Sequence, residues 1–85
     1  MQHELKILPE YFTAIIFGKK NFEIRKNDRD FRVGDVLKLM EYAGGKYTGS
    51  FIRREIVYIY HGDGNYGLEK GYCVLGLSER QLPRT

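Results

Sequence analysis

The chain lacks the cysteine pairs that often stabilise a small protein and the long apolar runs that span a membrane. Its 85 residues include one cysteine, two prolines and no tryptophan. The single cysteine, Cys73, excludes an internal disulfide, which is typical of a reducing compartment. No run approaches the roughly 20 apolar residues of a membrane span. The first residues also lack the basic-then-apolar layout of a signal peptide. We therefore expect a cytoplasmic protein with no membrane partner.

The length fits one domain over residues 1–85, with 79–85 as a loose tail. No repeat, low-complexity tract or linker divides the chain. A protein this small buries only about 60–65% of its unfolded surface, so its core must be built from few residues. Cys73 lies in the apolar run Tyr72–Leu77. We therefore expect a buried structural thiol rather than a reactive one.

Alternation of apolar and polar residues predicts five strands. Glycines at 44 and 45 indicate a hairpin connection, whereas the charged pair Arg53-Arg54 breaks the alternation and predicts a bulge or a twist. Short glycine turns favour antiparallel pairing, and closing the sheet would remove its exposed edges. The predicted fold is α+β: a small, mostly antiparallel five-stranded β-barrel with one N-terminal helix. Its expected strands are His3–Leu8, Asn21–Lys26, Val36–Glu41, Tyr47–Tyr60 and Tyr72–Ser78.

One short helix is expected between the first two strands. Pro9 suits the first helical position, and Gly18 suits the residue just past the helix end. Leu8 offers no side-chain acceptor for the first amides, so the helix begins with a weak cap.

Positive charge is concentrated in one window of the chain. The net charge of the chain is +3. Residues 19–32 hold six basic and three acidic residues, so the surplus of positive charge in this window equals the net charge of the whole chain. A localised surplus indicates an anionic partner, although a solvated surface loop would have the same composition. The basic residues of the window are Lys19, Lys20, Arg25, Lys26, Arg29 and Arg32.

Within this window, a helix stop is followed at once by a strand. Phe22 and Ile24 are expected to pack on the core, so that Glu23 and Arg25 share the opposite face. Lys20 follows the turn at the end of the helix, and we expect its flexible side chain to reach a cleft. An ammonium, a carboxylate and a guanidinium would then meet, which suits recognition of a phosphate or a base edge. The alternative is a surface ion pair worth only about 0–1 kcal/mol.

Gly18, Lys20, Glu23 and Arg25 match the pattern G-x-K-x-x-E-x-R. This pattern resembles the signature of ASCH domains, the activating-signal-cointegrator homology group of PUA-like barrels. The resemblance covers nearly the whole chain, to about residue 77, and is closest to a compact bacterial and phage branch. It implies a β-barrel with a cleft lined by the signature and a role in binding RNA or a nucleotide. The ligand-binding residues so expected are Lys20, Glu23, Arg25, Lys19, Arg29 and Arg32.

Two other functions stay open. One ASCH-like group resembles this chain at Lys20 and hydrolyses the acyl amide of a modified cytidine, so Lys20 would be the catalytic residue of an enzyme. That group carries threonine where this chain has Glu23. The third possibility is a protein-interaction adaptor.

A second glycine pattern, G-x-G-x-x-G at residues 62–67, has the form of a dinucleotide-binding motif. That motif must open a helix within a βαβ unit, whereas here another strand follows. We expect a loop at the rim of the cleft, where His61 and Tyr66 could contact a ligand. His3 and His61 are the only histidines and no ligand-spaced cluster surrounds them, so no metal or other cofactor is expected.

Overall fold

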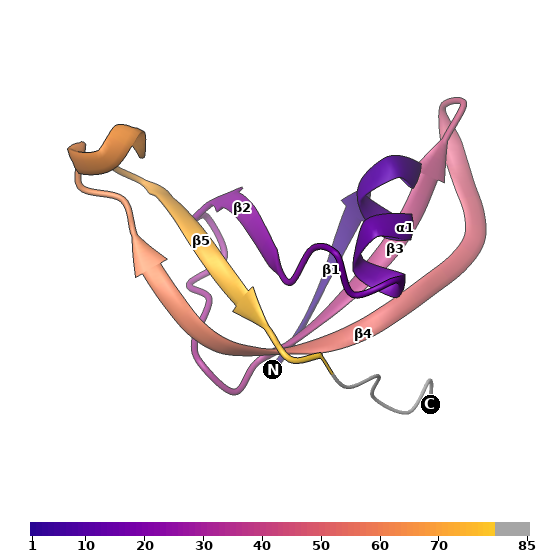
Figure 1. Ribbon diagram of the computed structural model, residues 1–85, viewed down its shortest axis with the longest axis horizontal. Helices are drawn as coiled ribbons and strands as arrows, with labels where there is room; N and C mark the ends of the chain where they lie inside the picture. Colours follow the sequence, from indigo (N-terminus) through magenta and orange to yellow (C-terminus); the bar gives the residue numbers. More distant parts are fainter. Residues whose placement is uncertain (80–85) are drawn as a thin grey trace.

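The computed structural model describes residues 1–79, which form five strands, one α-helix and a short 3-10 helix (Figure 1). The predicted α+β class, with five strands and an N-terminal helix, is confirmed. Most of the tail predicted over 79–85 lies outside the described residues. In chain order the elements are β1 (Gln2–Ile7), α1 (Pro9–Ile16), β2 (Phe22–Lys26), β3 (Val36–Ala43), β4 (Lys46–His61), η1 (Asn65–Gly67) and β5 (Tyr72–Leu77).

The strands form one mixed sheet in the order β1-β3-β4-β5-β2. Strand β1 runs parallel to β3, whereas β3–β4, β4–β5 and β2–β5 are antiparallel, so the mostly antiparallel pairing is confirmed. Within the described chain, β1 and β2 are the two edges and are not paired with each other. The sheet is therefore open, and closure into a barrel is not shown.

Strand β4 joins the two halves of the sheet. Its first part pairs with β3 and its last part with β5, and the strand bends along the base of the molecule between them (Figure 1). The predicted bulge at Arg53-Arg54 is wrong, because both residues keep a regular register with β3. The register shifts that involve β4 lie elsewhere: one against β3 between Phe51 and Tyr47, and one against β5 between Ile56 and Tyr58. Arg54 does not break the alternation: it is an inward-facing residue.

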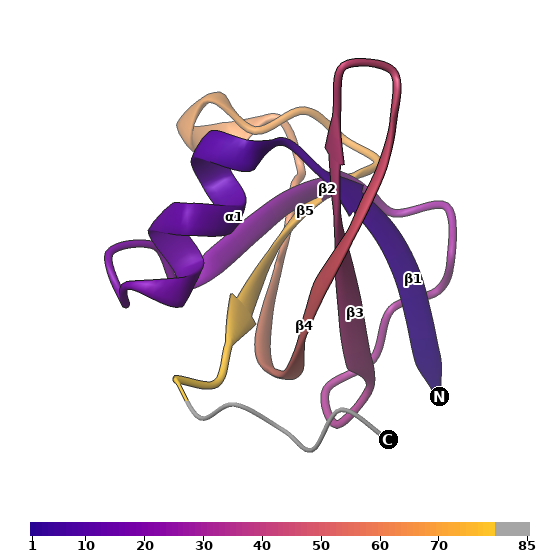
Figure 2. The ribbon, with the colours of Figure 1, turned by 90° about the vertical axis from the view of Figure 1, so that its right-hand side faces the viewer.

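The helix begins and ends as its sequence predicts. Pro9 opens α1, Leu8 contributes no side-chain cap, and Gly18 follows the helix with φ +73°. Helix α1 buries Phe12 and Ile15 and contacts β3. Figure 2 shows the helix to one side of β3. The two-residue turn between β3 and β4 has positive φ at both glycines, as a type I′ hairpin requires. The fully buried centre of the core consists of Leu37, Leu39, Ile56, Leu75 and Cys73.

Strand β2 turns the opposite face to the core from the one predicted. Glu23 is only 5% exposed, whereas Phe22 and Ile24 are 39% and 54% exposed. The reason is the register with β5, which sets Glu23 opposite the fully buried Leu75. Directly opposed residues in an antiparallel pair share a face of the sheet. The expectation that Phe22 and Ile24 anchor β2 to the core is therefore wrong.

A buried polar contact fixes the turn before β3. Asp35 Oδ2 lies 2.8 Å from His3 Nε2 and accepts the Arg32 amide at 3.1 Å. The His3 ring is buried and meets Phe31 edge-on, with centroids 4.8 Å apart. The hydrogen bond from His3, reinforced by that from the Arg32 amide, holds the pKa of the Asp35 carboxyl below its usual value.

We expect this contact to make stability depend on pH in the acid range. Because the folded pKa of Asp35 lies below its unfolded value of about 3.9, the ionised carboxylate stabilises the fold above about pH 4. That contribution is lost as the pH falls through the folded pKa. Asp35→Asn should therefore flatten the acid limb of urea midpoints measured between about pH 2 and 7. Asp63→Asn, which alters an exposed carboxylate, should keep that limb. Identical acid limbs in Asp35→Asn and the parent would contradict this role.

Candidate functional site

Glu23 is the centre of an ion network on the inner face of β2. Lys20 Nζ donates to Glu23 Oε1 at 2.5 Å, and Arg25 Nε donates to Oε2 at 3.0 Å. The Glu23 side chain is 6% exposed, and those of Lys20 and Arg25 are 17% and 27% exposed. The structure thus brings the three central residues of the predicted site into direct contact. They form a partly buried network rather than a solvated surface pair.

The turn after α1 sets the position of Lys20. Gly18 donates its amide to the Ile15 carbonyl, and the next two amides both donate to Ala14, which closes the helix end tightly. Lys20 then stands two residues before β2, and its Nζ reaches forward to the Phe22 carbonyl at 2.8 Å. The positive φ of Gly18 is what allows this reversal.

The Lys20 ammonium also lies near two aromatic rings. Its Nζ is 4.9 Å from the centroid of Phe22 and 5.2 Å from that of Tyr11, within cation–π range. An ammonium has three N–H donors, and Glu23 and the Phe22 carbonyl take two of them. Within residues 1–79, one donor of Lys20 therefore remains for a ligand.

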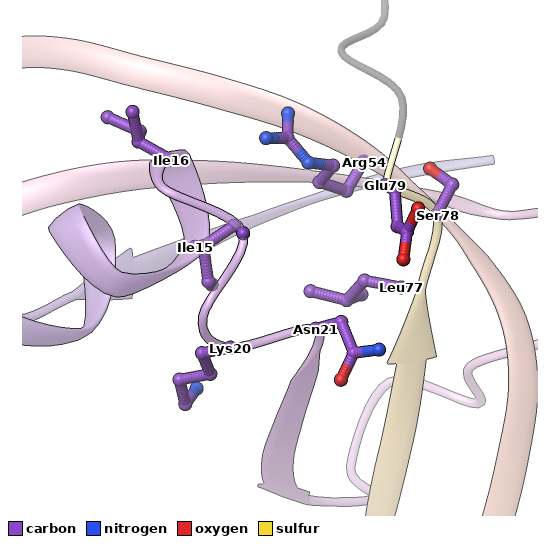
Figure 3. Close-up of a pocket in the computed structure, with 9 residues that line it drawn as sticks. Ile15, Ile16, Lys20, Asn21, Arg54, Leu77, Ser78 and Glu79 are labelled. Atoms are coloured by element: carbon purple, nitrogen blue, oxygen red, sulfur yellow. The ribbon is translucent and has the colours of Figure 1, made fainter.

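Two cavities meet at Lys20. The larger, about 360 Å³, opens at the unpaired edge of β2 and is lined by Tyr11, Lys20, Phe22, Glu23 and Ile24. The smaller, about 230 Å³, lies between the end of α1 and the end of β5 (Figure 3). Its walls combine aliphatic and polar side chains, namely Ile15, Ile16, Lys20, Asn21, Arg54, Leu77, Ser78 and Glu79.

Arg54 is a candidate that sequence reasoning missed. It is only 5% exposed, on the core face of β4 between Ile52 and Ile56, and burial lowers its pKa. In the smaller cavity Arg54 and Lys20 lie at opposite ends, with Leu77 between them (Figure 3). The period-two spacing of residues 52, 54 and 56 was the signal that could have placed this arginine inside.

Arg25 and Arg29 make structural contacts with the other edge of the sheet. Arg25 Nη2 donates to the Lys6 carbonyl at 2.5 Å, and Arg29 Nη1 donates to the Glu4 carbonyl at 2.7 Å. The two carbonyls belong to alternate residues of the edge strand β1, where no strand among residues 1–79 completes the pairing. The two guanidinium groups therefore cap an edge that would otherwise be open.

The remaining predicted residues lie apart from these cavities. Lys19 is exposed in the turn, and Arg32 is exposed and pairs with Asp30 at 2.9 Å, a hydrogen bond that raises the pKa of Arg32. His61 ends β4 and Tyr66, 95% exposed, lies in η1. Neither of the last two lines a cavity at the signature, so the predicted rim contacts are not brought to it.

The glycine-rich segment and Cys73 both have packing explanations. Residues 62–67 lead through η1 into β5, and a Cβ at Gly62 would come within 2.2 Å of the Glu69 carbonyl oxygen. The loop therefore folds back on itself and opens no helix of a βαβ unit. Cys73 is fully buried, as predicted, and desolvation raises the pKa of its thiol.

The comparisons with known proteins identify the family of the chain. Residues 2–77 match the family described as a domain of unknown function, DUF3850, and the chain belongs to this family. Over 54 residues, 64% of the chain, it is 41% identical to an "Uncharacterized 12.9 kDa protein in GpA 3'region" of Escherichia phage P2. The match covers 50% of that relative, so it spans about half of the relative's length.

Among residues 1–79, no group of three or more histidine, cysteine, aspartate or glutamate side chains is placed to hold a metal ion. In the same part of the chain, no helix is both long and apolar enough to cross a membrane.

The ion network predicts a large cost for neutralising Glu23. Glu23→Gln would leave two cations with less than half-exposed side chains facing an uncharged amide, and should lower the free energy of unfolding by about 1–3 kcal/mol. Urea denaturation measures this directly. The matched change Glu69→Gln, at an exposed glutamate, should stay within about 0.5 kcal/mol of the parent. Equal effects of the two substitutions would show that the network does not stabilise the fold.

Proposed function

We propose that this protein binds a nucleotide or a short single-stranded RNA segment at Lys20, as a PUA-like module of the ASCH type. The observation that carries the proposal is the position of Lys20 between two cavities, with one N–H donor left for a ligand. The basic window and the G-x-K-x-x-E-x-R signature support it. So does the mixture of aromatic, aliphatic and charged groups around one ammonium.

The larger cavity has the chemistry of a base-binding site. Tyr11 and Phe22 offer rings for stacking at its edge. Glu23 presents a carboxylate whose two oxygens have about four acceptor sites, of which Lys20 and Arg25 use two. An exocyclic amine of a base is a suitable donor to the others. A volume of about 360 Å³ suits one base with part of its sugar rather than a longer segment.

The smaller cavity has the chemistry of a phosphate or sugar site. Lys20 and Arg54 give its lining two positive charges against the one negative charge of Glu79, and Asn21 adds an amide that can donate or accept. The pocket is partly walled by aliphatic side chains, which strengthens the field of these cations relative to open water. A nucleotide could thus place its base on one side of Lys20 and its phosphate on the other.

The relation to PUA-like barrels is also part of this proposal. We infer that the open sheet is a barrel-like arrangement, in which Arg25 and Arg29 join the two edges where a closed barrel has strand pairing. The cleft of such a fold would lie beside α1, where the signature residues are.

Ligand binding should depend on Lys20. In a thermal-shift screen with nucleosides, nucleotides and short RNAs, a ligand at 100 times its Kd should stabilise the protein by about 2.7 kcal/mol. Lys20→Ala should abolish this stabilisation, whereas Lys20→Arg should keep part of it, because a guanidinium retains the charge. Lys46→Ala, at an exposed lysine of the β3–β4 hairpin, is the control and should bind normally. Circular dichroism at low temperature checks that each variant is folded. Undiminished binding by Lys20→Ala, or no binding by the parent, would refute the proposal.

The affinity for a mononucleotide or a trinucleotide should depend only weakly on salt concentration. Lys20 and Arg54 are the two cations in the linings of these cavities, so a short ligand there should make one or two cationic contacts. The slope of log K against log salt should then be about −0.7 to −1.4, at about −0.7 per phosphate contact on a single strand. Arg32→Ala should leave it unchanged. A slope steeper than about −3 would instead mean that the basic window follows a phosphate backbone.

A further inference from the structure

The outer face of β2, β5 and the end of β4 is unusually aromatic and exposed. The register aligns Phe22, Gly76 and Tyr58 in one row across the three strands, and Ile24, Val74 and Tyr60 in the next. Exposure is 39% for Phe22 and for Tyr72, 54% for Ile24 and 66% for Tyr58. We call this surface the outer aromatic face; its residues are Phe22, Ile24, Lys26, Tyr58, Tyr60, Tyr72, Val74 and Gly76.

Gly76, in the middle of the first row, is not required by the fold. Its φ lies outside the left-handed region, and a Cβ built there would meet only Tyr58, at 3.4 Å or more. This is ordinary van der Waals contact, unlike the 2.2 Å clash at Gly62. A glycine inside a strand weakens it and often marks a bulge or a place where a ligand approaches the backbone, and Gly76 lies beside the register shift between Ile56 and Tyr58.

Gly76 places peptide backbone without a side chain, here called the slot, between Phe22 and Tyr58 on the outer aromatic face. Phe22 and Tyr58 stand on the strands to either side of Gly76, two strand spacings or about 10 Å apart. Between them the surface is peptide backbone. A flat, rigid group could stand in this slot with one of its faces toward each aromatic side chain, which is the geometry that a nucleobase needs for stacking.

The charges of the face favour a polyanion. Lys26 is the charged residue among the outward positions, and no carboxylate is present there. At the Phe22 end, the Lys20 ammonium lies 4.9 Å from the ring centroid. A second copy of this chain would bring the same net charge of +3 to the contact, whereas a phosphate backbone brings the opposite sign.

We propose that the outer aromatic face is a stacking platform for single-stranded nucleic acid that leaves the Lys20 site. Phe22 and Ile24 belong both to this face and to the lining of the larger cavity, so the two surfaces are continuous around the edge of β2. One base would occupy the cavity, and the next bases would lie over Gly76 toward Tyr58 and Tyr60. This inference rests on the proposed function and extends it from a nucleotide to a strand.

The test compares a long and a short ligand on the same variants. Fluorescence anisotropy measures binding of labelled oligouridine and oligodeoxythymidine of about eight nucleotides, and titration measures uridine monophosphate. Gly76→Ala, which fills the slot, should raise the Kd of the oligonucleotides about tenfold and leave that of the mononucleotide unchanged. Tyr58→Ala should act alike. Tyr47→Ala, at a half-exposed tyrosine in the other part of β4, is the matched control and should bind as the parent does.

The outcomes separate the platform from the Lys20 site. Selective loss of oligonucleotide affinity in Gly76→Ala, without a lower unfolding midpoint, supports the platform for RNA, for DNA or for both, according to which oligonucleotide is affected. If Lys20→Ala still binds the mononucleotide while Gly76→Ala loses the oligonucleotides, the platform stands and the Lys20 site fails. Unchanged oligonucleotide binding in both face variants overturns the platform, as does a parent that binds neither oligonucleotide. A dimer in sedimentation that Tyr58→Ala dissolves would assign the face to a second copy and also overturn it.

Discussion

The carboxylate of Glu23 is the contact on which both the fold and the candidate site depend. It binds Lys20 from the turn after α1 and Arg25 from β2, and Arg25 continues to the carbonyl of Lys6 on β1. One carboxylate therefore links the helix end to both edges of the open sheet. Buried ion pairs add little net stability over apolar packing, but losing one partner leaves the others uncompensated. The value of this network lies in fixing where the chain segments meet.

In this arrangement the contacts that hold the edge strand β1 and the contacts to a ligand would compete for the same N–H donors. The N–H groups that Arg25 and Arg29 give to β1 carbonyls are not available to a phosphate. In the proposed site, recognition would be left to the third donor of Lys20, the remaining lone pairs of Glu23 and the rings beside them. A basic window in a sequence thus overstates the number of N–H donors that a ligand meets, because some of them complete the backbone hydrogen bonding of an edge strand.

Local pattern predicts the elements of this protein well and the orientation of β2 badly. Pro9, Gly18 and the glycine turn at 44 and 45 act through their own backbone geometry, so their effects are visible without the rest of the chain. The inner face of β2 depends instead on its register with β5, some 50 residues away in sequence. Hydrophobicity pointed to Phe22 and Ile24, but a buried polar network reverses that preference. Arg54 is a similar case: in the sequence its charge looks like an interruption of the alternation in β4, whereas in the structure it occupies a buried, inward-facing position that keeps the alternation.

The inversion of β2 ties the site and the outer aromatic face to each other. Side chains in a strand alternate between faces, so burying Glu23 and Arg25 forces Phe22 and Ile24 outward. A slip of one residue in the register would bury the two apolar residues and expose the ion network. Exposed apolar surface is unfavourable in water, which makes a surface of this kind significant when polar residues are buried in its place. The register of β2 thus determines both the ion network and the exposed rings. Any ligand that binds one of them lies next to the other.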